Sequence, residues 1–240
     1  MSAFDLIDVC QELGGITILD HVNLEIPERE FTALIGPSGA GKTCLLRLLN
    51  RLDDPTVGTV RYLGRPVAQL AVREHRARVG FVFQTPIMFS GSVRDNLAVA
   101  AEIIGVQPPV ADERMKESLR LAEVDVDMLD RDAARLSVGQ QQRVSIARTL
   151  MTVPSALLLD EPTASLDPET ADRLMRTVAR LSADNGVTVV AATHRLAEAR
   201  RRSGYVVMME AGKIIEAGPT DVIFEKSEHP RIRSFLESMS

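Results

Sequence analysis

The feature that most constrains this chain is a glycine-rich loop that fits the phosphate-binding pattern G-x-x-x-x-G-K-[ST]. The segment before it, residues 31–35, is apolar and β-favouring, and residues 44–52 after it carry apolar side chains at helical spacing. A strand, a glycine turn and a helix N-terminus are the context that such a loop requires, so the chain must build a strand–loop–helix unit. The loop consists of Gly36, Pro37, Ser38, Gly39, Ala40, Gly41, Lys42 and Thr43.

The chemistry of this loop predicts a site for a nucleoside triphosphate. Its glycines allow backbone N–H groups to turn toward a polyphosphate, and the helix dipole adds partial positive charge there. Lys42 would reach the β- and γ-phosphates, and the Thr43 hydroxyl would ligate Mg²⁺. A glycine-rich turn that matches by chance is disfavoured, because the full spacing occurs together with the flanking strand and helix.

Composition places the chain among ordinary globular proteins. Its 240 residues can bury a sizeable core, and 45% hydrophobic and 25% charged residues are typical values. The net charge of −5 provides no basic field, so we expect no nucleic acid partner. The two cysteines, Cys10 and Cys44, make no ligand or disulfide pattern and suit a reducing cytosol. We expect neither a membrane-spanning segment nor a signal peptide.

The order of apolar segments predicts an α/β fold: a P-loop (RecA-like) core with a mainly parallel sheet, an added antiparallel β subdomain and an inserted α-helical subdomain. The opening, residues 4–26, is β-rich, and later strands alternate with helical segments. From Ser92 to about Met151 the pattern is helical. We expect a single domain, 1–240, with residues 1–91 and 152–240 in the β subdomain and core and residues 92–151 in the helical subdomain.

Two adjacent carboxylates, Asp160 and Glu161, follow the apolar run at residues 157–159. The carboxyl end of such a strand is where α/β proteins place their ligand sites. Asp160 suits Mg²⁺, directly or through water, and Glu161 could orient or deprotonate the water that attacks the γ-phosphate. An Asp-Glu pair alone is weak evidence, and its pairing with the phosphate loop makes the assignment strong.

A second unusual string, residues 136–143 (LSVGQQQR), has a Ser and a Gly at the start of a predicted helix. Ser137 fits an N-cap, and Gln140 three residues later would complete a capping box. The plain interpretation is a capped helix. The other interpretation is a second anion site, which would serve a different ATP because the loop at residues 36–43 already supplies one.

Taken in order, the motifs of this chain resemble those of the ATP-binding subunits of ABC transporters. The resemblance extends from about residue 6 to residue 236. Its ordered motifs are the phosphate loop, Gln84 after VGFVF, the LSVGQ signature, LLLDEP at 157–162, ASLD at 164–167 and His194 after VTVVAAT. In this family two subunits sandwich two ATP molecules, each between one subunit's phosphate loop and the other's signature. The resemblance thus implies a dimer and accounts for a second anion site.

The resemblance also implies roles for single residues. Gln84 is similar to the glutamine that contacts Mg²⁺ and water and senses the membrane subunit. The signature residues Ser137, Gly139 and Gln140 would grip the γ-phosphate bound by the partner chain. Asp167 is similar to an aspartate that crosses the dimer interface. His194 is similar to a histidine that contacts the γ-phosphate.

Three positions depart from the usual family pattern. Val138 replaces the first signature glycine, but Ser137 and Gly139 remain, so we expect γ-phosphate contact to survive. Leu13 aligns near the aromatic that usually stacks on adenine, so we expect weaker base stacking and a less secure preference for ATP over GTP. Arg29 stands where a turn glycine is usual, which concerns folding rather than catalysis.

The subtype evidence within the family is mixed. Residues 136–150 are similar to ATPases of the metal-efflux and aluminium-tolerance type, whereas residues 218–236 are similar to phosphate and polar amino-acid importers. We favour an importer-like subunit, with a metal-efflux exporter as the alternative. A soluble ABC ATPase of DNA repair, chromosome maintenance or translation is less favoured, because this chain has one phosphate loop and no heptad run. A P-loop kinase or GTPase would lack LSVGQ and His194.

The resemblance implies partners and a location as well. The partners are a second copy of the chain, integral-membrane subunits that dock from Gln84 to Leu97, and a solute-binding protein. The chain would act in the cytoplasm, peripherally on the cytosolic face of the cell membrane. The transported solute would be recognised by other chains, so this sequence does not specify it.

Overall fold

A six-stranded sheet forms the centre of the computed structural model, which describes residues 1–238. The strand order is β10–β9–β3–β8–β7–β6, and all neighbours are parallel except the hairpin of β9 and β10. The predicted mainly parallel sheet is therefore confirmed. The strands are β3 (Phe31–Ile35), β6 (Val79–Val82), β7 (Ala156–Asp160), β8 (Thr188–Ala192), β9 (Tyr205–Glu210) and β10 (Lys213–Pro219).

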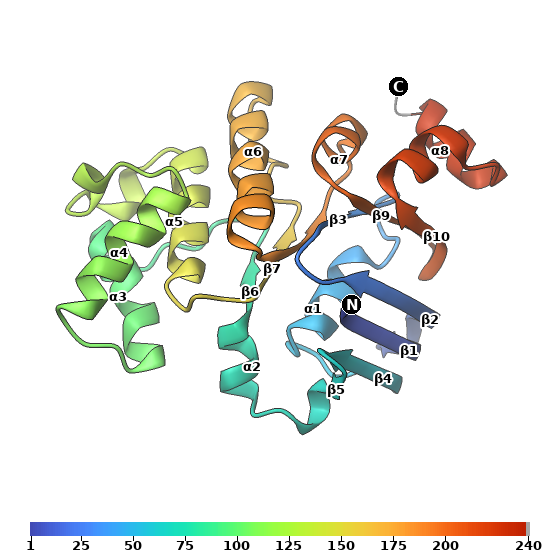
Figure 1. Ribbon diagram of the computed structural model, residues 1–240, viewed down its shortest axis with the longest axis horizontal. Helices are drawn as coiled ribbons and strands as arrows, with labels where there is room; N and C mark the ends of the chain where they lie inside the picture. Colours follow the sequence, from blue (N-terminus) through green and yellow to red (C-terminus); the bar gives the residue numbers. More distant parts are fainter. Residues whose placement is uncertain (239–240) are drawn as a thin grey trace.

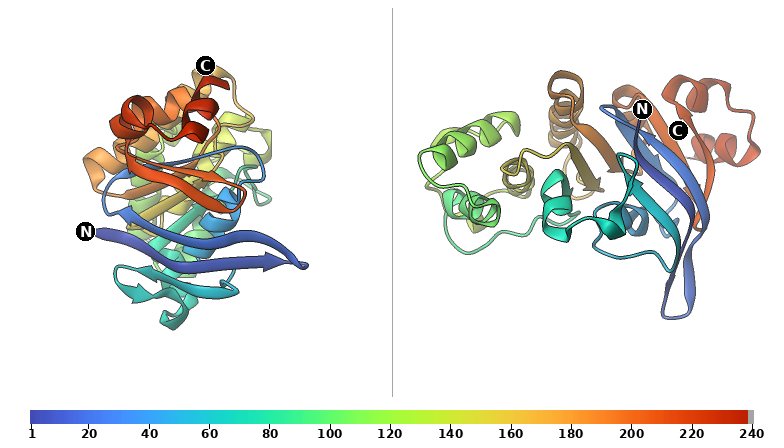
Figure 2. Two further views of the ribbon diagram at one scale, coloured as in Figure 1. Left: turned by 90° about the vertical axis from the view of Figure 1, so that its right-hand side faces the viewer. Right: turned by 60° about the horizontal axis from the view of Figure 1, so that its bottom comes forward.

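A second, antiparallel sheet has the order β2–β1–β4–β5 and confirms the predicted β-rich addition (Figures 1 and 2). Its long strands pair around a turn at Gly14 and Gly15, both at positive φ. Glycine reaches this conformation without the steric cost of a Cβ. The strands are β1 (Ser2–Leu13), β2 (Ile16–Pro27), β4 (Val57–Tyr62) and β5 (Arg65–Pro66).

The helix after the phosphate loop, α1 (Lys42–Leu49), packs in the core between the two sheets. Successive residues of β3 point to opposite faces, as in any strand. Leu34 therefore joins the cluster around α1, whereas Ala33 and Ile35 pack against α7 (Leu196–Arg202) and α8 (Pro230–Ser238) on the other face. The phosphate loop is thus held between two sheets at the carboxyl ends of the parallel strands.

A helical region lies to one side of the central sheet and contains α3, α4 and α5 (Figure 1). Met115, Leu119 and Ala122, which recur at helical spacing along the sequence, are buried there. Helix α6 lies between this region and α7 in Figure 1. The division into subdomains at residues 91 and 151 remains a prediction. The remaining helices are α2 (Val72–Arg78), α3 (Val93–Ile104), α4 (Val110–Leu121), α5 (Val138–Leu150) and α6 (Pro168–Asn185), with short turns at Val67–Gln69, Val126–Met128, Ala133–Arg135 and Val222–Lys226.

Helix α1 ends earlier than its apolar pattern predicts. The pattern continues to Leu52, but the helix stops at Leu49. The Asn50 side-chain amide donates to the Val79 carbonyl of β6, and Arg51 takes a positive φ of 57°. A long-range side-chain bond therefore ends the helix. Arg29 also has positive φ, 58°, which agrees with the expectation that this position usually holds a turn glycine.

Candidate active site

The phosphate loop depends on glycine at two places where it contacts neighbouring strands. Gly41 precedes α1 with φ +98°, and a Cβ there would lie 2.8 Å from Leu19 Cδ2. Gly36 has φ +144°, and a Cβ there would overlap the Met209 carbonyl of β9. Both the backbone conformation and the lack of space therefore exclude larger residues, and the loop N–H groups can approach an anion closely.

Lys42 begins α1 and is 5% exposed. Its Nζ donates to the Gly36 carbonyl at 2.8 Å and the Pro37 carbonyl at 3.0 Å, and lies 3.8 Å from Glu161 Oε1. Burial lowers the pKa of the Lys42 ammonium, and the nearby carboxylates of Glu161 and Asp160 oppose that shift. The ammonium is thus fixed across the loop, where it can meet phosphate oxygens.

Thr43 and Asp160 meet at the end of β7, with the Thr43 hydroxyl donating to Asp160 Oδ1 at 2.8 Å. Asp160 is 7% exposed, and burial raises the pKa of its carboxyl, with the Glu161 carboxylate adding to the rise. A hydroxyl and a carboxylate are the oxygen donors that Mg²⁺ prefers. The two side chains therefore fit a Mg²⁺ ion, which would also relieve the cost of burying this carboxylate.

Glu161 and His194 come together at the carboxyl ends of adjacent strands β7 and β8. His194 Nδ1 lies 3.3 Å from Glu161 Oε2, and the other carboxylate oxygen faces Lys42. Glu161 has a positive φ of 43°, a conformation that non-glycine residues rarely adopt and that often marks functional sites. The carboxylate is thereby held among an ammonium, an imidazole and the buried Asp160.

A cavity of about 520 Å³ beside the phosphate loop joins most of the predicted site residues of one chain. Residues 38–43, Gln84 and Glu161 line it, and Leu13 forms part of its wall together with Ile18. Leu13 is 52% exposed, so this wall offers an aliphatic rather than an aromatic side chain. Gln84 is also exposed and is the second residue after the end of β6.

The signature residues lie elsewhere. Ser137, Gly139 and Gln140 line a separate cavity of about 360 Å³ at the start of α5. The predicted capping box is present: the Gln140 N–H donates to Ser137 Oγ at 3.3 Å and the Ser137 N–H to Gln140 Oε1 at 3.0 Å. Asp167 caps α6, accepting from the N–H groups of Glu169 and Thr170. The structure of one chain does not bring these four residues to the phosphate loop.

Four lining residues of the larger cavity were not predicted as site residues: Ile18, Cys44, Arg47 and Asp53. Arg47 lies one helical turn after Thr43, and Arg47 Nε donates to Asp53 Oδ2 at 2.5 Å. This ion pair lowers the pKa of the Asp53 carboxyl. Helical spacing from Thr43 could have identified Arg47, whereas the contact of Asp53 depends on the turn that ends α1.

The segment after Gln84 presents apolar side chains at the surface. Ile87 is 56% exposed and Phe89 is 46% exposed, while Met88 packs against the helical region. The Asn96 side-chain carboxamide accepts from the Phe89 N–H and donates to the Phe89 carbonyl, and the Arg148 guanidinium lies 4.9 Å from the Phe89 ring centroid. The apolar surface is therefore fixed in place rather than buried. Within the described part of the chain, no helix is long and apolar enough to cross a membrane.

Known proteins with similar sequences belong to the same family that the ordered motifs indicate. A family model described as ABC transporter matches residues 19–164. Protein STAR1 of Oryza sativa subsp. japonica is 38% identical over 226 residues, which cover 94% of this chain and 64% of that protein. The methionine import ATP-binding protein MetN of Cereibacter sphaeroides is 40% identical, covering 95% and 66%. The phosphate import ATP-binding protein PstB of Thermotoga maritima is 39% identical, covering 93% and 92%. The chain thus spans about two thirds of some relatives and nearly all of others.

Solved structures agree with these relatives. The cbiO1 protein of Clostridium perfringens, described as part of the ABC transporter complex cbiONQ, superposes with a TM-score of 0.87 at 26% identity, covering 98% of this chain and 99% of that one. A dimeric post-hydrolysis structure of the ATP-binding cassette MJ0796, bound to ADP and Pi, gives 0.80 at 30% identity, covering 90% and 98%. This chain therefore belongs to the ABC transporter family, as one of its ATP-binding, ATP-hydrolysing subunits.

Proposed function

We propose that the chain hydrolyses ATP as a homodimer with two Mg·ATP at the interface, each between the phosphate loop of one copy and the signature of the other. The observation that carries this proposal is the separation of the site into two cavities in one chain. Residues that bind phosphate and activate water line the first, and Ser137, Gly139 and Gln140 line the second. The MJ0796 cassette is described as dimeric and bound to ADP and Pi, which supports dimer formation by this chain.

Each residue of the site then has a physical role. Lys42 and the loop N–H groups would neutralise the β- and γ-phosphates. Thr43, Asp160 and Gln84 would hold Mg²⁺, which would supply further shielding of phosphate charge. Glu161 accepts a proton from the attacking water. His194, on the neighbouring strand, orients the Glu161 carboxylate. Ser137, Gly139 and Gln140 would complete the phosphate shell from the second copy, with Asp167 beside them at the interface.

The exposed apolar surface and the names of the related proteins together support a partner in transport. The exposed side chains of Ile87 and Phe89, at the start of the segment from Gln84 to Leu97, suit an apolar segment of integral-membrane subunits. The names of MetN and PstB describe importers, so we favour import of a small solute, with a solute-binding protein as a further partner. The chain would then lie on the cytosolic face of the membrane.

Replacing the catalytic carboxylate tests the proposed hydrolysis. Glu161→Gln removes the base but keeps the shape of the side chain, so hydrolysis should fall by about 10²–10⁴-fold while ATP binding persists. Because ATP is then not consumed, the dimer should accumulate and be seen by sedimentation in ATP and Mg²⁺. Glu113→Gln, an exposed glutamate of α4, is the matched control. Wild-type turnover in Glu161→Gln, or no dimer at saturating ATP, would contradict the proposal.

A charge in the apolar surface tests the membrane partner. Ile87→Asp should sharply reduce recovery of membrane subunits with this chain after co-expression, because a carboxylate would be desolvated at the contact. Val110→Asp changes a similarly exposed valine on α4 and should leave recovery intact. Equal recovery with both variants would place the docking surface elsewhere and leave the ATPase assignment unaffected.

A further inference from the structure

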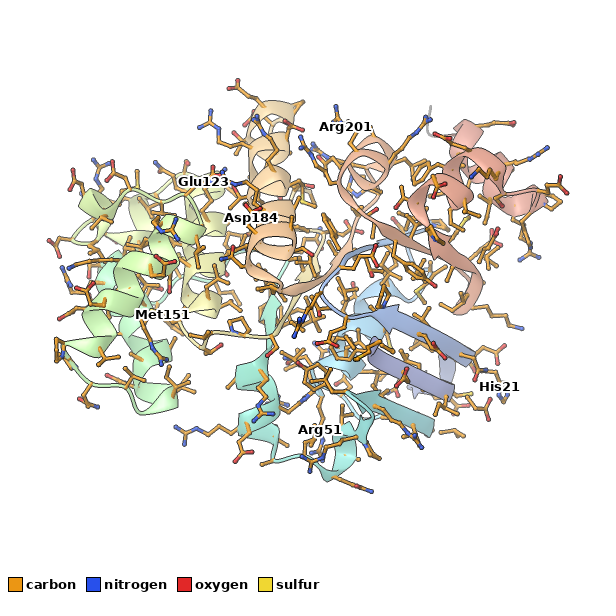
Figure 3. The ribbon with its side chains drawn as sticks, viewed as in Figure 1. His21, Arg51, Glu123, Met151, Asp184 and Arg201 are labelled. Atoms are coloured by element: carbon orange, nitrogen blue, oxygen red, sulfur yellow. The ribbon has the colours of Figure 1, made fainter. Side chains whose placement is uncertain are left out.

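Among residues 1–238, one cluster brings together three different metal-ligating side chains: Cys10 of β1 with Asp20 and His21 of β2. Their ligand atoms all lie within 4.8 Å of one another. The cluster lies at the outer edge of the antiparallel sheet, where Figure 3 labels His21. It is formed by cross-strand pairing, so the spacing of cysteines in the sequence does not show it. The expectation that Cys10 belongs to no ligand pattern is therefore revised.

The two strands are irregular at this point. The β1–β2 register shifts on both sides of Val9, and Asp8 and His21 each take a positive φ, 51° and 49°. Such bulges redirect side chains and recur beside functional sites. Here the His21 ring lies close to the carboxylates of Asp8 and Asp20. The backbone N–H of His21 donates to Cys10 Sγ at 3.3 Å.

Asp8 orients the imidazole for coordination. Asp8 Oδ1 lies 2.6 Å from His21 Nδ1, so this nitrogen carries a proton and Nε2 keeps its lone pair in the neutral ring. A carboxylate behind a ligating histidine is the usual support of a protein metal site. His21 Nε2 faces Asp20 Oδ1 at 3.9 Å. Two tetrahedral ligand atoms, each about 2.1 Å from a zinc ion, lie roughly 3.4 Å apart. A small inward movement of these exposed side chains would therefore fit a cation between the two atoms.

We propose that Cys10, Asp20 and His21 bind one borderline divalent cation of the Zn²⁺ class. A thiolate and an imidazole select Zn²⁺, Co²⁺ or Ni²⁺ over Mg²⁺ or Ca²⁺, which prefer oxygen ligands. The only ammonium on the cluster among the described residues is that of Lys213, 3.0 Å from Asp20 Oδ2, which leaves Oδ1 free. Once coordination has released the Cys10 thiol proton, the two carboxylates and the thiolate together exceed the Lys213 charge by that of a divalent cation.

The site is an open one, with three protein ligands and room for water. The side chains of His21 and Asp20 are 68% and 36% exposed, so solvent reaches the fourth position. Three protein ligands with a solvent ligand are typical of accessible zinc sites. None of the three cluster residues lines the ATP cavity, so this site is distinct from the Mg²⁺ site proposed at Thr43 and Asp160.

A cobalt titration of the full chain, free of any affinity tag and of thiol reductants, tests the site. One equivalent of Co²⁺ should produce a thiolate-to-cobalt charge-transfer absorption that Zn²⁺ displaces. Cys10→Ser should abolish this absorption, and Asp8→Asn should weaken Zn²⁺ binding about 10–100-fold by removing the support of the imidazole. Cys44→Ser and His229→Asn are the matched controls and should titrate as wild type.

The folded state of each variant is checked by thermal unfolding without metal. Zn²⁺ should raise the unfolding midpoint of wild type and of the controls, because it binds the folded chain, but not that of Cys10→Ser. If Cys10→Ser did not fold, His21→Asn would carry the same test, since asparagine tolerates positive φ. No cobalt–thiolate absorption in wild type, or absorption that survives Cys10→Ser, would overturn the proposal.

Discussion

At the scale of single residues, the site contains carboxylates that respond to their surroundings in opposite ways. Burial raises the pKa of the Asp160 carboxyl, and the hydrogen bond from the Thr43 hydroxyl opposes that rise. Asp53 pairs with Arg47, which lowers its pKa. A carboxylate with a raised pKa contributes stability at low pH that is lost as pH rises through the folded-state pKa, and one with a lowered pKa contributes stability that is lost as pH falls. The two positions should therefore respond differently to neutralisation.

Asp160→Asn should stabilise the nucleotide-free chain at neutral pH while reducing Mg²⁺-dependent hydrolysis by at least about 10²-fold. The amide avoids a buried negative charge, and each kcal/mol gained raises the unfolding midpoint by roughly 2–4 °C. Asp53→Asn should instead lower the midpoint, because it breaks a favourable ion pair. Thermal unfolding at several pH values measures both, and the gain from Asp160→Asn should disappear toward pH 4. A midpoint lowered equally by both changes would show that burial does not dominate at Asp160.

At the scale of secondary-structure elements, the start of α5 is tightly packed against α6. A Cβ at Gly139 would lie 2.7 Å from Thr170 Cγ2, closer than side chains normally approach. The neighbouring position differs, because Val138 is 47% exposed and its side chain points to solvent. This agrees with the observation that the first signature glycine is replaced here and the second is retained.

Gly139→Ala should therefore destabilise the chain by about 1–3 kcal/mol through overpacking. Thr170→Ser removes the obstructing methyl group, so the double variant should recover most of that loss. Urea unfolding of the two single variants and the double variant forms a cycle that isolates the contact. Simple additivity of the two effects would show that the strain arises from the helix backbone instead.

Structural features that depend on residues close together in the sequence could be predicted. Features that depend on contacts between distant segments could not. The apolar run of β3 and the capping box of Ser137 and Gln140 depend on neighbours within a few residues, and both are confirmed. The end of α1 depends on a bond from Asn50 to Val79, and the cluster at Cys10 depends on a bulge in strand pairing. Neither has a periodic signal, because the partners meet only after the sheets form.

The same distinction applies to the candidate site. Lys42, Thr43, Asp160, Glu161 and His194 could be predicted to meet, because parallel strands end at one edge of a sheet. The wall formed by Ile18, Arg47 and Asp53 follows from how α1 packs between the sheets, and no motif marks it. The roles given to the signature residues remain a prediction, since one chain holds them in a separate cavity.

At the scale of the whole molecule, the two halves of the proposed site are connected within one chain. The Gln142 side-chain amide of α5 donates to the Phe83 carbonyl at 3.2 Å, immediately before Gln84. The helix that begins with the signature is therefore bonded to the segment that lines the ATP cavity. A movement of α5 on dimer closure would therefore shift the backbone at Gln84 and the exposed apolar surface that follows Gln84.

In the proposed dimer a second copy completes each catalytic pocket, so the ATPase rate should depend on chain concentration. The wild-type chain is assayed at saturating ATP and Mg²⁺, over a range that includes concentrations at which sedimentation shows monomers. The total rate should vary as the square of chain concentration in the monomer range and linearly once dimers predominate, because only dimers have complete pockets. A rate per chain that stays constant throughout the monomer range would contradict it.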